Sequence, residues 1–440
     1  MRRAEYQRRR RAILAEMPAD SLLLLPAASE AVRSRDVDHP YRQDSDLLYL
    51  TGFPEPDALA VLAPKRKNGE FILFCRARDP EKETWDGARA GIEGAIADYR
   101  AAEAHPIAEL DERMPALLEG RTRIYYPLGR DPVFDRRLMG WIASVRAKVR
   151  GGVRAPSELV ASDRLLHERR LIKDAVELRT MHRAARISAA AHRRAMQRCR
   201  PGLWEYQLEA ALVHHCADRG ARFQAYPPIV GSGANACVLH YVDNCHRLRD
   251  GDLVLIDAGC ELDGYASDIT RTFPVNGRFS VPQRELYELV LAAQAAAIAK
   301  AVPGNRWNEP HDAAVRVLTT GLVELGILPG TRRSVPKLIR EERYKPFFMH
   351  RTGHWLGMDV HDVGDYRVGD DWRTFKPGMV FTVEPGLYIP ASNEEAPPAY
   401  RDIGIRIEDD VAITADGHEV LTADAPKDPA AIEALVGTRA

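Results

Sequence analysis

The sequence predicts an α+β protein of two domains, an N-terminal α/β domain at residues 1–170 and a larger α+β domain at residues 171–440. Three observations predict this class. The length of 440 residues exceeds what one hydrophobic core normally holds. Short apolar runs alternate with helical patterns in the first part of the chain. In the rest, two helical patterns precede a strand-rich stretch, and this order occurs twice.

The N-terminal segment MRRAEYQRRRRAIL is basic, and the apolar run that follows it, Leu22 to Leu25, ends at Pro26. This run is too short for a signal peptide or a membrane span. We therefore expect an amphipathic first helix with a solvated basic face, followed by a strand.

Four apolar runs in the first domain predict strands, and the segment from Arg136 to Arg150 has a helical pattern between the last of them and the second domain. The runs are SLLLLPA at 21, DALAVLAP at 57, GEFILFCR at 69 and RIYYPL at 123. Two glycines and a proline lie between Gly151 and Pro156, and a Ser/Glu/Asp-rich stretch then leads into the charged run HERRLIKDAVELR. This composition predicts a domain boundary at about residue 170, within about ten residues.

The second domain has a different rhythm. Helical patterns at 173–200 and 204–218 precede a strand-rich stretch at 223–275. Helical patterns at 283–301 and 311–326 then precede strands at roughly 379–413. This repeated order indicates an internal duplication, with helices packed on one side of a largely antiparallel sheet. A site would lie on the sheet between the two halves.

The segment DLVLIDAGCELDGYASDITRTF from Asp252 predicts a hairpin, because Asp263-Gly264 is a strong turn signal between two β-rich runs. Any even-length loop places Asp257 and Asp268 on the same face. If the two were directly opposed, their Cβ atoms would be about 4.5–5.5 Å apart. Their charges would repel beside an apolar strand, and a divalent ion between them would remove that cost. The alternative is a pair of solvent-facing aspartates on an exposed sheet.

Three histidines, His350, His354 and His361, lie in the glycine-punctuated segment FFMHRTGHWLGMDVHDVGDY. Gly353 and Gly357 argue against a regular helix, so we expect one metal ligand and two histidines that support it or face a substrate. Each histidine alone would more often be a structural residue.

Two further carboxylates stand at strand ends. Glu384 follows an apolar strand that Pro385-Gly386 terminates, and Glu408 lies two residues after Arg406, on the same face. Arg406 and Glu408 could instead form a structural ion pair. Four carboxylates and one imidazole have the composition of a two-metal hydrolytic site, and oxygen-rich ligands favour ions such as Mn²⁺. The five candidates are Asp257, Asp268, His354, Glu384 and Glu408.

Six motifs resemble the pita-bread metallopeptidase family, and within it the aminopeptidase P group: YRQDSDLLYLTGF at 41, LHYVDN at 239, IDAGCELDGYASDITRTFPV at 256, MHRTGHWLGMDVHDVG at 349, TVEPGLYI at 382 and GIRIEDD at 404. The resemblance implies a non-catalytic N-terminal domain and a pita-bread catalytic domain. It also implies that Asp257 binds one metal, that Asp268 and Glu408 bridge two, and that His354 and Glu384 hold the other. The two ions would share a hydroxide; Mn²⁺ is expected, and Zn²⁺, Co²⁺ or Fe²⁺ would also fit.

The same resemblance implies the remaining roles. Glu384 would act as the general base, His361 would donate to the oxyanion, and His240 would steady the substrate near its proline. His350 is a candidate substrate-facing residue from the spacing of the histidine segment alone. Arg406 would hold the metal-binding carboxylates in place.

The implied substrate is a peptide with proline in the second position. The bond before proline is a tertiary amide without an N–H group, so an apolar slot must accept the ring. Trp85 matches a tryptophan that approaches the site of a neighbouring subunit in this family, which implies a homo-oligomer, a dimer or a tetramer. The alternative for Trp85 is a place in the core.

Arg351 departs from the family pattern, which commonly has glycine directly after the first histidine of this segment. A bulky cation there could narrow the cleft or contact the carboxyl end of the peptide. Prolidase, which cleaves Xaa-Pro dipeptides with the same site, is the main alternative. An amidinohydrolase without metal or a non-catalytic relative would lack the five ligands, and methionine aminopeptidase usually lacks the first domain.

The charge of the chain is nearly balanced, with 62 Lys and Arg against 63 Asp and Glu. We therefore expect no nucleic acid and no membrane as a partner. The six cysteines form no C-x-x-C pair, and a disulfide scaffold is a feature of much smaller secreted chains. This pattern favours the reducing cytoplasm.

Overall fold

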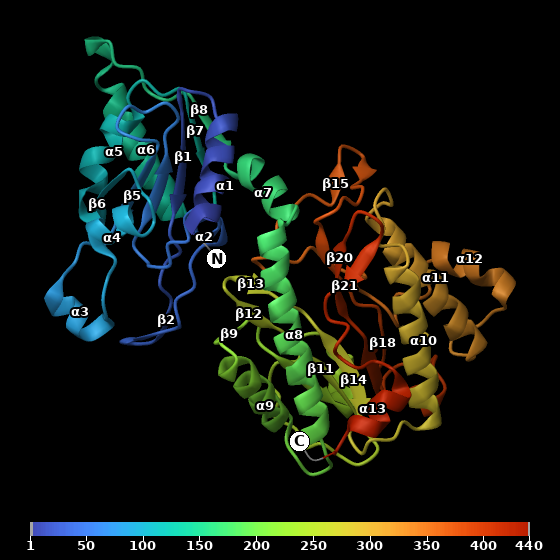
Figure 1. The fold of residues 1–440 in the computed structure, drawn as a ribbon. Coiled ribbons are helices and arrows are strands. Elements are labelled where there is room, and N and C mark those ends of the chain that lie inside the picture. Colours follow the sequence, from blue (N-terminus) through green and yellow to red (C-terminus); the bar gives the residue numbers. More distant parts are fainter. Residues whose placement is uncertain (1–2, 439–440) are drawn as a thin grey trace. The chain divides into compact units, whose positions relative to one another are not determined.

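A computed structural model describes residues 3–438, and the chain divides into two compact units, 1–168 and 169–440 (Figure 1). The division falls within α7 (Asp163–Leu171). Each unit is described by itself.

The N-terminal unit is built on a six-stranded sheet with the strand order β6-β5-β4-β1-β7-β8. Strand β1 pairs antiparallel with β4 and parallel with β7. Its residues Leu22 and Leu24 are fully buried against Met114 of α5 and Leu138 of α6. The elements are α1 (Arg3–Glu16), β1 (Ser21–Pro26), β2 (Val32–Ser34), β3 (Val37–Asp38), α2 (Ser45–Thr51), β4 (Leu59–Leu62), β5 (Phe71–Cys75), α3 (Pro80–Asp86), α4 (Gly91–Ala97), β6 (Glu103–Pro106), α5 (Leu110–Leu118), β7 (Arg123–Tyr126), α6 (Pro132–Arg146) and β8 (Glu158–Ala161).

The four predicted strands are confirmed as β1, β4, β5 and β7. Sequence analysis missed β6 (EAHP) and β8 (ELVA), which are short and carry few apolar residues. Each pairs with a buried neighbour, β5 or β7, so pairing rather than its own composition makes it a strand.

The predicted solvated basic face of the first helix is wrong for two residues. Arg9 and Arg10 are only 3% and 4% exposed. Their guanidinium groups donate to the carbonyls of Tyr49 (3.1 Å) and Leu50 (2.8 Å) in the last turn of α2. A helix end leaves such carbonyls without intrahelical partners, and two arginines of α1 supply the missing donors.

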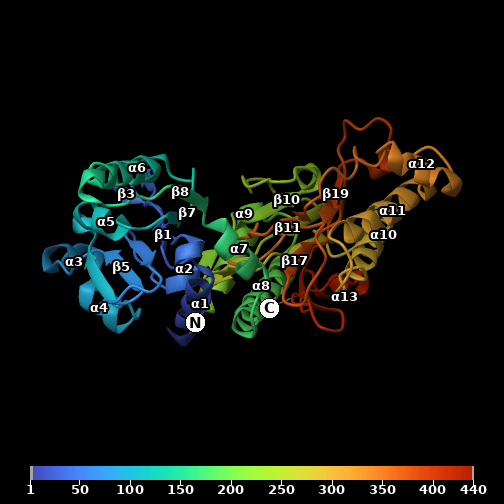
Figure 2. The ribbon, with the colours of Figure 1, turned by 90° about the horizontal axis from the view of Figure 1, so that it is seen from above.

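The C-terminal unit repeats the predicted order of two helices followed by strands, and each helix pair, α8–α9 and α10–α11, packs side by side (Figures 1 and 2). All its strand pairs in the described residues are antiparallel. The first half contains α8 (Ala175–Arg198), α9 (Glu205–Asp218), β9 (Phe223–Gln224), β10 (Ile229–Ser232), β11 (Leu253–Asp257), β12 (Cys260–Leu262), β13 (Tyr265–Ala266) and β14 (Thr270–Pro274). The second half contains α10 (Val281–Ile298), α11 (Asn308–Glu324), α12 (Val335–Arg340), β15 (Arg367–Val368), β16 (Asp371–Trp372), β17 (Val380–Val383), β18 (Gly386–Ile389), β19 (Ile403–Arg406), β20 (Asp409–Ile413), β21 (His418–Val420) and α13 (Pro429–Leu435).

In the hairpin that carries two of the candidate ligands, Asp257 and Asp268 are not directly opposed. Asp257 pairs with Thr270, and Leu262 pairs with Tyr265 across the turn Asp263-Gly264. Both turn residues have positive φ, as a two-residue hairpin turn requires. Because the turn is centred one position later than the midpoint between the aspartates, Asp268 lies diagonally from Asp257, on the same face.

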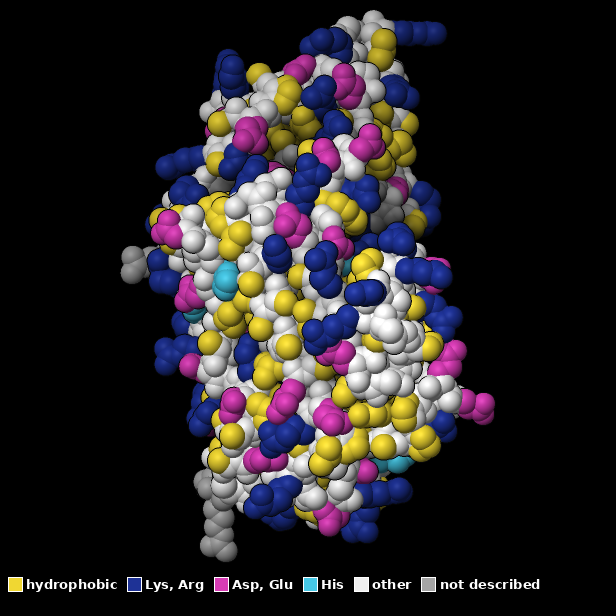
Figure 3. Space-filling view, turned by 90° about the vertical axis from the view of Figure 1, so that its right-hand side faces the viewer, with side chains coloured by type: hydrophobic (Ala, Val, Ile, Leu, Met, Phe, Trp, Pro, Cys, Tyr) yellow, Lys and Arg dark blue, Asp and Glu magenta, His cyan; other side chains and the backbone are white. Residues whose placement is uncertain are grey.

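The surface of the face drawn in Figure 3 carries Lys and Arg interspersed with Asp and Glu, in keeping with the balanced composition. Among residues 3–438, no helix is both long enough and apolar enough to cross a membrane.

Candidate active site

One cavity of the C-terminal unit, about 470 Å³ in volume, is lined by all five candidate ligands. It is also lined by the other four residues of this unit that the sequence singled out for substrate or catalysis. Together these nine are Asp257, Asp268, His354, Glu384, Glu408, His240, His350, His361 and Arg406. Residues that are up to about 170 positions apart in the sequence therefore meet in one place.

Three of the candidate ligands form a compact cluster. Asp268, His354 and Glu408 each offer a ligand atom within 4.8 Å of the others. Asp268 and Glu408 are only 5% and 2% exposed. Nε2 of His354 lies 3.4 Å from an oxygen of Asp268 and 3.8 Å from an oxygen of Glu384. Oxygen and nitrogen donors at these separations can bind one divalent cation.

Asp257 joins this cluster through a shared partner. The hydroxyl of Tyr226 donates to Oδ1 of Asp257 at 2.6 Å and also contacts Oδ1 of Asp268. A partly buried carboxylate and a buried one therefore approach one hydroxyl group, which is a position that a cation could also take. Tyr226 was not predicted as a site residue, although it lies in AYPPI, three residues before the start of β10, the strand that pairs with β11.

Buried negative charge dominates the electrostatics of the cavity. Burial and the neighbouring carboxylates raise the pKa of Glu384 to about 7 and that of Glu408 well above its ordinary value. Burial also raises the pKa of Asp257, against the opposing charge of Arg406. Burial alone would lower the pKa of His354, but Asp268 and Glu384 raise it to about 9. Such a set of carboxylates attracts positive charge, and divalent cations fit it.

Arg406 pairs with Asp257, in place of the alternative pairing with Glu408. Its Nη2 donates to Oδ2 of Asp257 at 2.6 Å and its Nε to Oγ1 of Thr270 at 3.1 Å. The same threonine hydroxyl donates to Oε2 of Glu408 at 2.7 Å. Arg406 and Thr270 thus tie the carboxylates of two separate strands together.

The three other histidines that line the cavity differ in their surroundings. Nε2 of His350 lies 2.9 Å from the hydroxyl of Tyr388, which also accepts from Arg406, so this ring is held in place. Burial, with the charge of Arg406, lowers the pKa of His350 to about 3. Burial also lowers the pKa of His361, whose ring centroid is 4.2 Å from that of His354. His240 is exposed at the cavity. The neutral imidazoles of His350 and His361 can donate to a substrate.

The glycines among the histidines reflect close packing of two chain segments. The N–H of Glu384 donates to the carbonyl of Thr352 at 2.8 Å, and the N–H of Thr382 donates to the carbonyl of His354 at 3.0 Å. A Cβ atom on Gly353 would lie 1.9 Å from the carbonyl oxygen of Thr382. Glycine is therefore required for His354 and Glu384 to lie next to each other.

A buried polar network lies behind the carboxylates. Arg271 is fully buried and donates to Oδ1 of Asp409 (2.6 Å) and to the carbonyl of Glu408 (2.5 Å). Gln294 of α10 donates to the carbonyls of Val383 (3.3 Å) and Ile407 (3.1 Å), which directly precede Glu384 and Glu408. Helix α10 thus fixes both strand ends at the site. Sequence analysis did not find this network.

A second buried cluster supports the histidine segment. Asp362, which follows His361, accepts from Arg170 at 2.6 Å and from Lys173 at 3.0 Å. Burial alone would raise the pKa of Asp362, but the charges of Lys173 and Arg170 outweigh it and hold this pKa below the ordinary 3.8. The carboxylate therefore stabilises the fold while it is ionised.

This cluster predicts acid sensitivity. Because the pKa of Asp362 is lower in the folded state than in the unfolded state, its ionised carboxylate stabilises the fold. This contribution is full above a pH of about 4 and is lost as the pH falls through the folded-state pKa. We expect Asp362→Asn to be less stable than the wild type at neutral pH, with a gap in Tm that narrows as the pH falls below about 4. Calorimetry at several pH values measures this gap. A gap that stays constant with pH would contradict the assignment.

Trp85, the remaining predicted site residue, lies on α3 of the N-terminal unit and is 86% exposed. The alternative of a core tryptophan is therefore wrong. The charged residues of the helix PEKETWD leave this short segment without a buried face. Its contact with a neighbouring subunit stays a prediction.

Comparison with known proteins covers both units. The model of Metallopeptidase family M24 matches residues 179–415, and that of the aminopeptidase P N-terminal domain matches residues 6–125. The Xaa-Pro aminopeptidase of Escherichia coli K12 is 46% identical over 435 residues, 99% of this chain and 98% of the relative. Human Xaa-Pro aminopeptidase 3 is 37% identical over 408 residues, 91% of this chain and 78% of the relative.

Solved structures resemble the whole chain as well. Aminopeptidase PepP of Pseudomonas aeruginosa has a TM-score of 0.97 at 57% identity, over 99% of this chain and 98% of the other. A zinc-substituted E. coli aminopeptidase P in complex with product has a TM-score of 0.95 at 45% identity, over 99% and 98%. The fold of this chain is therefore similar to that of known aminopeptidases.

Proposed function

The chain belongs to metallopeptidase family M24, and from that premise we propose that it is a Xaa-Pro aminopeptidase, which releases the N-terminal residue from peptides with proline in the second position. One observation carries this proposal: four carboxylates and one imidazole line one cavity, with three of them close enough to hold an ion. The N-terminal unit, which matches the aminopeptidase P N-terminal domain, would be the non-catalytic part, and the C-terminal unit would carry catalysis.

We propose that the cavity holds two divalent ions, with Mn²⁺ favoured by the oxygen-rich ligands. Asp257 would bind one ion, Asp268 and Glu408 would bridge both, and His354 and Glu384 would bind the other. The hydroxyl of Tyr226 contacts both Asp257 and Asp268. This supports a binding position that the two carboxylates share. Bound ions of this kind polarise a scissile carbonyl and lower the pKa of the attacking water.

The chain's own residues would supply positioning and proton transfer. Glu384, held by the backbone bond from its N–H to Thr352, would take the proton of the nucleophile. His361 would donate to the carbonyl oxygen as it gains charge, and His240 would steady the substrate. Arg406 would keep Asp257 ionised and oriented through its 2.6 Å bond.

Apolar side chains also line this cavity and would suit the proline ring. They are those of Pro227, Ile229, Leu239, Val242 and Val360. These side chains offer no hydrogen-bond donor or acceptor, and the tertiary amide before proline presents no N–H that would need an acceptor. A secondary amide in the same place would leave its N–H without a partner, which disfavours it.

A prolidase with the same site is not favoured, because the relatives from Escherichia coli and Haemophilus influenzae, 45–46% identical over nearly the full chain, are Xaa-Pro aminopeptidases. We infer a homo-oligomer, supported by the exposed Trp85, a large apolar side chain suited to a partner subunit. We also infer a cytoplasmic location, supported by the six free cysteines. Size-exclusion chromatography with light scattering tests the assembly, and a monomeric mass at micromolar concentration would contradict it.

A substrate panel tests the proposed activity. We expect the Mn²⁺-loaded protein to cleave Xaa-Pro-Yaa peptides and to leave Xaa-Ala-Yaa peptides and Xaa-Pro dipeptides largely intact, with activity lost on chelation and restored by Mn²⁺. Release of the N-terminal residue is measured by mass spectrometry. Cleavage of Xaa-Ala-Yaa with Xaa-Pro-Yaa untouched would overturn the specificity, and faster cleavage of the dipeptide would indicate a prolidase.

A further inference from the structure

Arg351 is a charged side chain at the rim of the active-site cavity. It is exposed, and it lines this cavity next to His350 and Gly353. Its Cζ lies 5.5 Å from the centroid of the Trp372 ring. Among residues 3–438, no hydrogen bond or ion pair joins its guanidinium to a carboxylate. The guanidinium therefore has free N–H donors beside the cavity.

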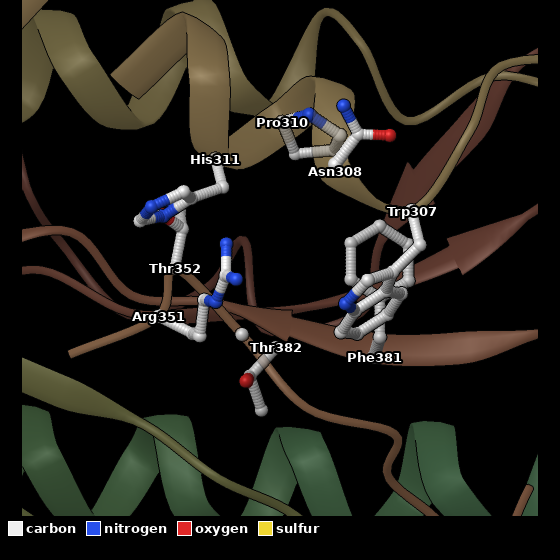
Figure 4. A pocket seen from close by; sticks show the side chains of 9 residues that line it. Trp307, Asn308, Pro310, His311, Arg351, Thr352, Phe381 and Thr382 are labelled. Atoms are coloured by element: carbon white, nitrogen blue, oxygen red, sulfur yellow. The ribbon is translucent and has the colours of Figure 1, made fainter. Parts of the chain in front are cut away.

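The backbone at Arg351 is anchored close to the catalytic carboxylate. The carbonyl of Arg351 lies 2.7 Å from Nδ1 of His350, and the next carbonyl, that of Thr352, accepts from the N–H of Glu384 at 2.8 Å. Consecutive Cα atoms are about 3.8 Å apart, so the arginine starts one residue from the segment paired with Glu384. Figure 4 shows a second pocket that Arg351 also lines, with its side chain extending toward His311 of α11.

Arg351 lies beside an imidazole and an ion pair that do not compete for an incoming negative group. The hydroxyl of Thr352 lies 2.8 Å from Nδ1 of His311. Burial, with the positive charges of Arg351 and Lys345, lowers the pKa of His311 to about 4, so this imidazole is neutral at physiological pH. The neighbouring acid Glu342 is paired with Lys345 at 2.7 Å. A negative group that reaches this rim can therefore pair with the guanidinium of Arg351.

We propose that Arg351 binds the C-terminal carboxylate of short substrates, and that the enzyme consequently prefers Xaa-Pro-Yaa peptides with a free carboxyl end. This inference rests on the proposed function, in which the N-terminal residue and the scissile bond lie at the carboxylate cluster. Two to three extended residues beyond the scissile bond span about 7–11 Å. The Arg351 side chain starts one residue from the segment paired with Glu384, so its guanidinium can reach a carboxylate at this distance from the scissile bond.

The chemistry of the rim fits a carboxylate. A guanidinium presents parallel N–H donors that match the two oxygens of a carboxylate, whereas a C-terminal amide offers one oxygen and no charge. The ring of Trp372, which also lies 4.1 Å from Cζ of Arg367, limits the motion of the arginine at the rim.

Paired substrates test this proposal. One Xaa-Pro-Yaa tripeptide is compared with its C-terminal amide, in the Mn²⁺-loaded wild type and in Arg351→Gln. The pair of the Arg351 guanidinium and the peptide carboxylate is exposed to solvent. In the wild type we therefore expect kcat/KM to be about three- to tenfold higher for the free acid than for the amide, mainly through KM. In the variant this ratio should fall toward one. Arg351→Lys should retain part of the preference, and added salt should weaken it.

Arg367→Gln is the matched control, since Arg367 stacks on the same tryptophan but does not line the cavity. It should keep the wild-type ratio. An unchanged ratio in Arg351→Gln, or the same drop in Arg367→Gln, would overturn the proposal while leaving the aminopeptidase activity in place. A wild type that cleaves neither peptide would instead contradict the proposed function itself.

Discussion

Replacing Asp268 by Asn is expected to lower kcat/KM on Xaa-Pro-Yaa peptides by about a thousandfold or more. Asp268 offers ligand atoms within 4.8 Å of those of His354 and Glu408 and shares the hydroxyl of Tyr226 with Asp257. An amide carries no charge and binds a divalent ion weakly. The Lewis-acid contribution of bound metal is several kcal/mol, and each 1.4 kcal/mol changes a rate about tenfold.

The matched control for this change lies in the same hairpin. Asp263→Asn alters an exposed turn residue with positive φ, a conformation that asparagine also adopts readily. Both variants should be assayed after Mn²⁺ loading, together with their metal content by mass spectrometry and their Tm. We expect Asp263→Asn to match the wild type. Full activity and full metal content in Asp268→Asn would show that the carboxylate cluster is not the metal site.

Replacing Arg271 by Met is expected to cost about 3–5 kcal/mol of unfolding free energy in the C-terminal unit. Arg271 is fully buried, bonds Asp409 and the carbonyls of Thr270 and Glu408, and has no path to water. Its loss leaves Asp409 buried with Lys427 as its one remaining ion-pair partner among residues 3–438, and it leaves carbonyl groups without donors. For a unit of this size the loss corresponds to about 6–20 °C in Tm.

A surface arginine provides the comparison. Arg284 pairs with Glu433 at 2.9 Å but is 36% exposed, so Arg284→Met should change stability by less than about 1 kcal/mol. Differential scanning calorimetry of both variants separates the two cases. Equal, small shifts in Tm would mean that the network around Asp409 does not stabilise the fold. A lowered metal affinity in Arg271→Met would further indicate that the network positions Glu408.

Local patterns were sufficient for much of the fold and for the choice of candidate ligands. Carboxylates that end apolar strands, such as Glu384 after VFTV, are conspicuous because a buried charge is costly without a partner. The helix pairs could be read from their periodicity, since α8 and α10 each bury one face. The short strands β6 and β8 could not, because only their neighbours make them strands.

The residues that contact the candidate ligands could not be predicted either, because these contacts also depend on distant parts of the chain. Tyr226 meets Asp268 across 42 positions, and Gln294 meets Ile407 across 113. A hydroxyl or an amide in the sequence carries no sign of the group it will contact. The register of the Asp257 hairpin likewise depended on where the turn is centred, which shifted Asp268 from opposite to diagonal.

By itself, then, the sequence determined which residues carry charge at strand ends, where helices and strands alternate, and which family the motifs resemble. Only the tertiary structure decided that Arg406 pairs with Asp257, that Arg9 and Arg10 are buried, and that Arg351 lies free at the cavity rim. Periodicity and charge are properties of a local segment, whereas burial and pairing depend on distant segments that meet only when the chain folds.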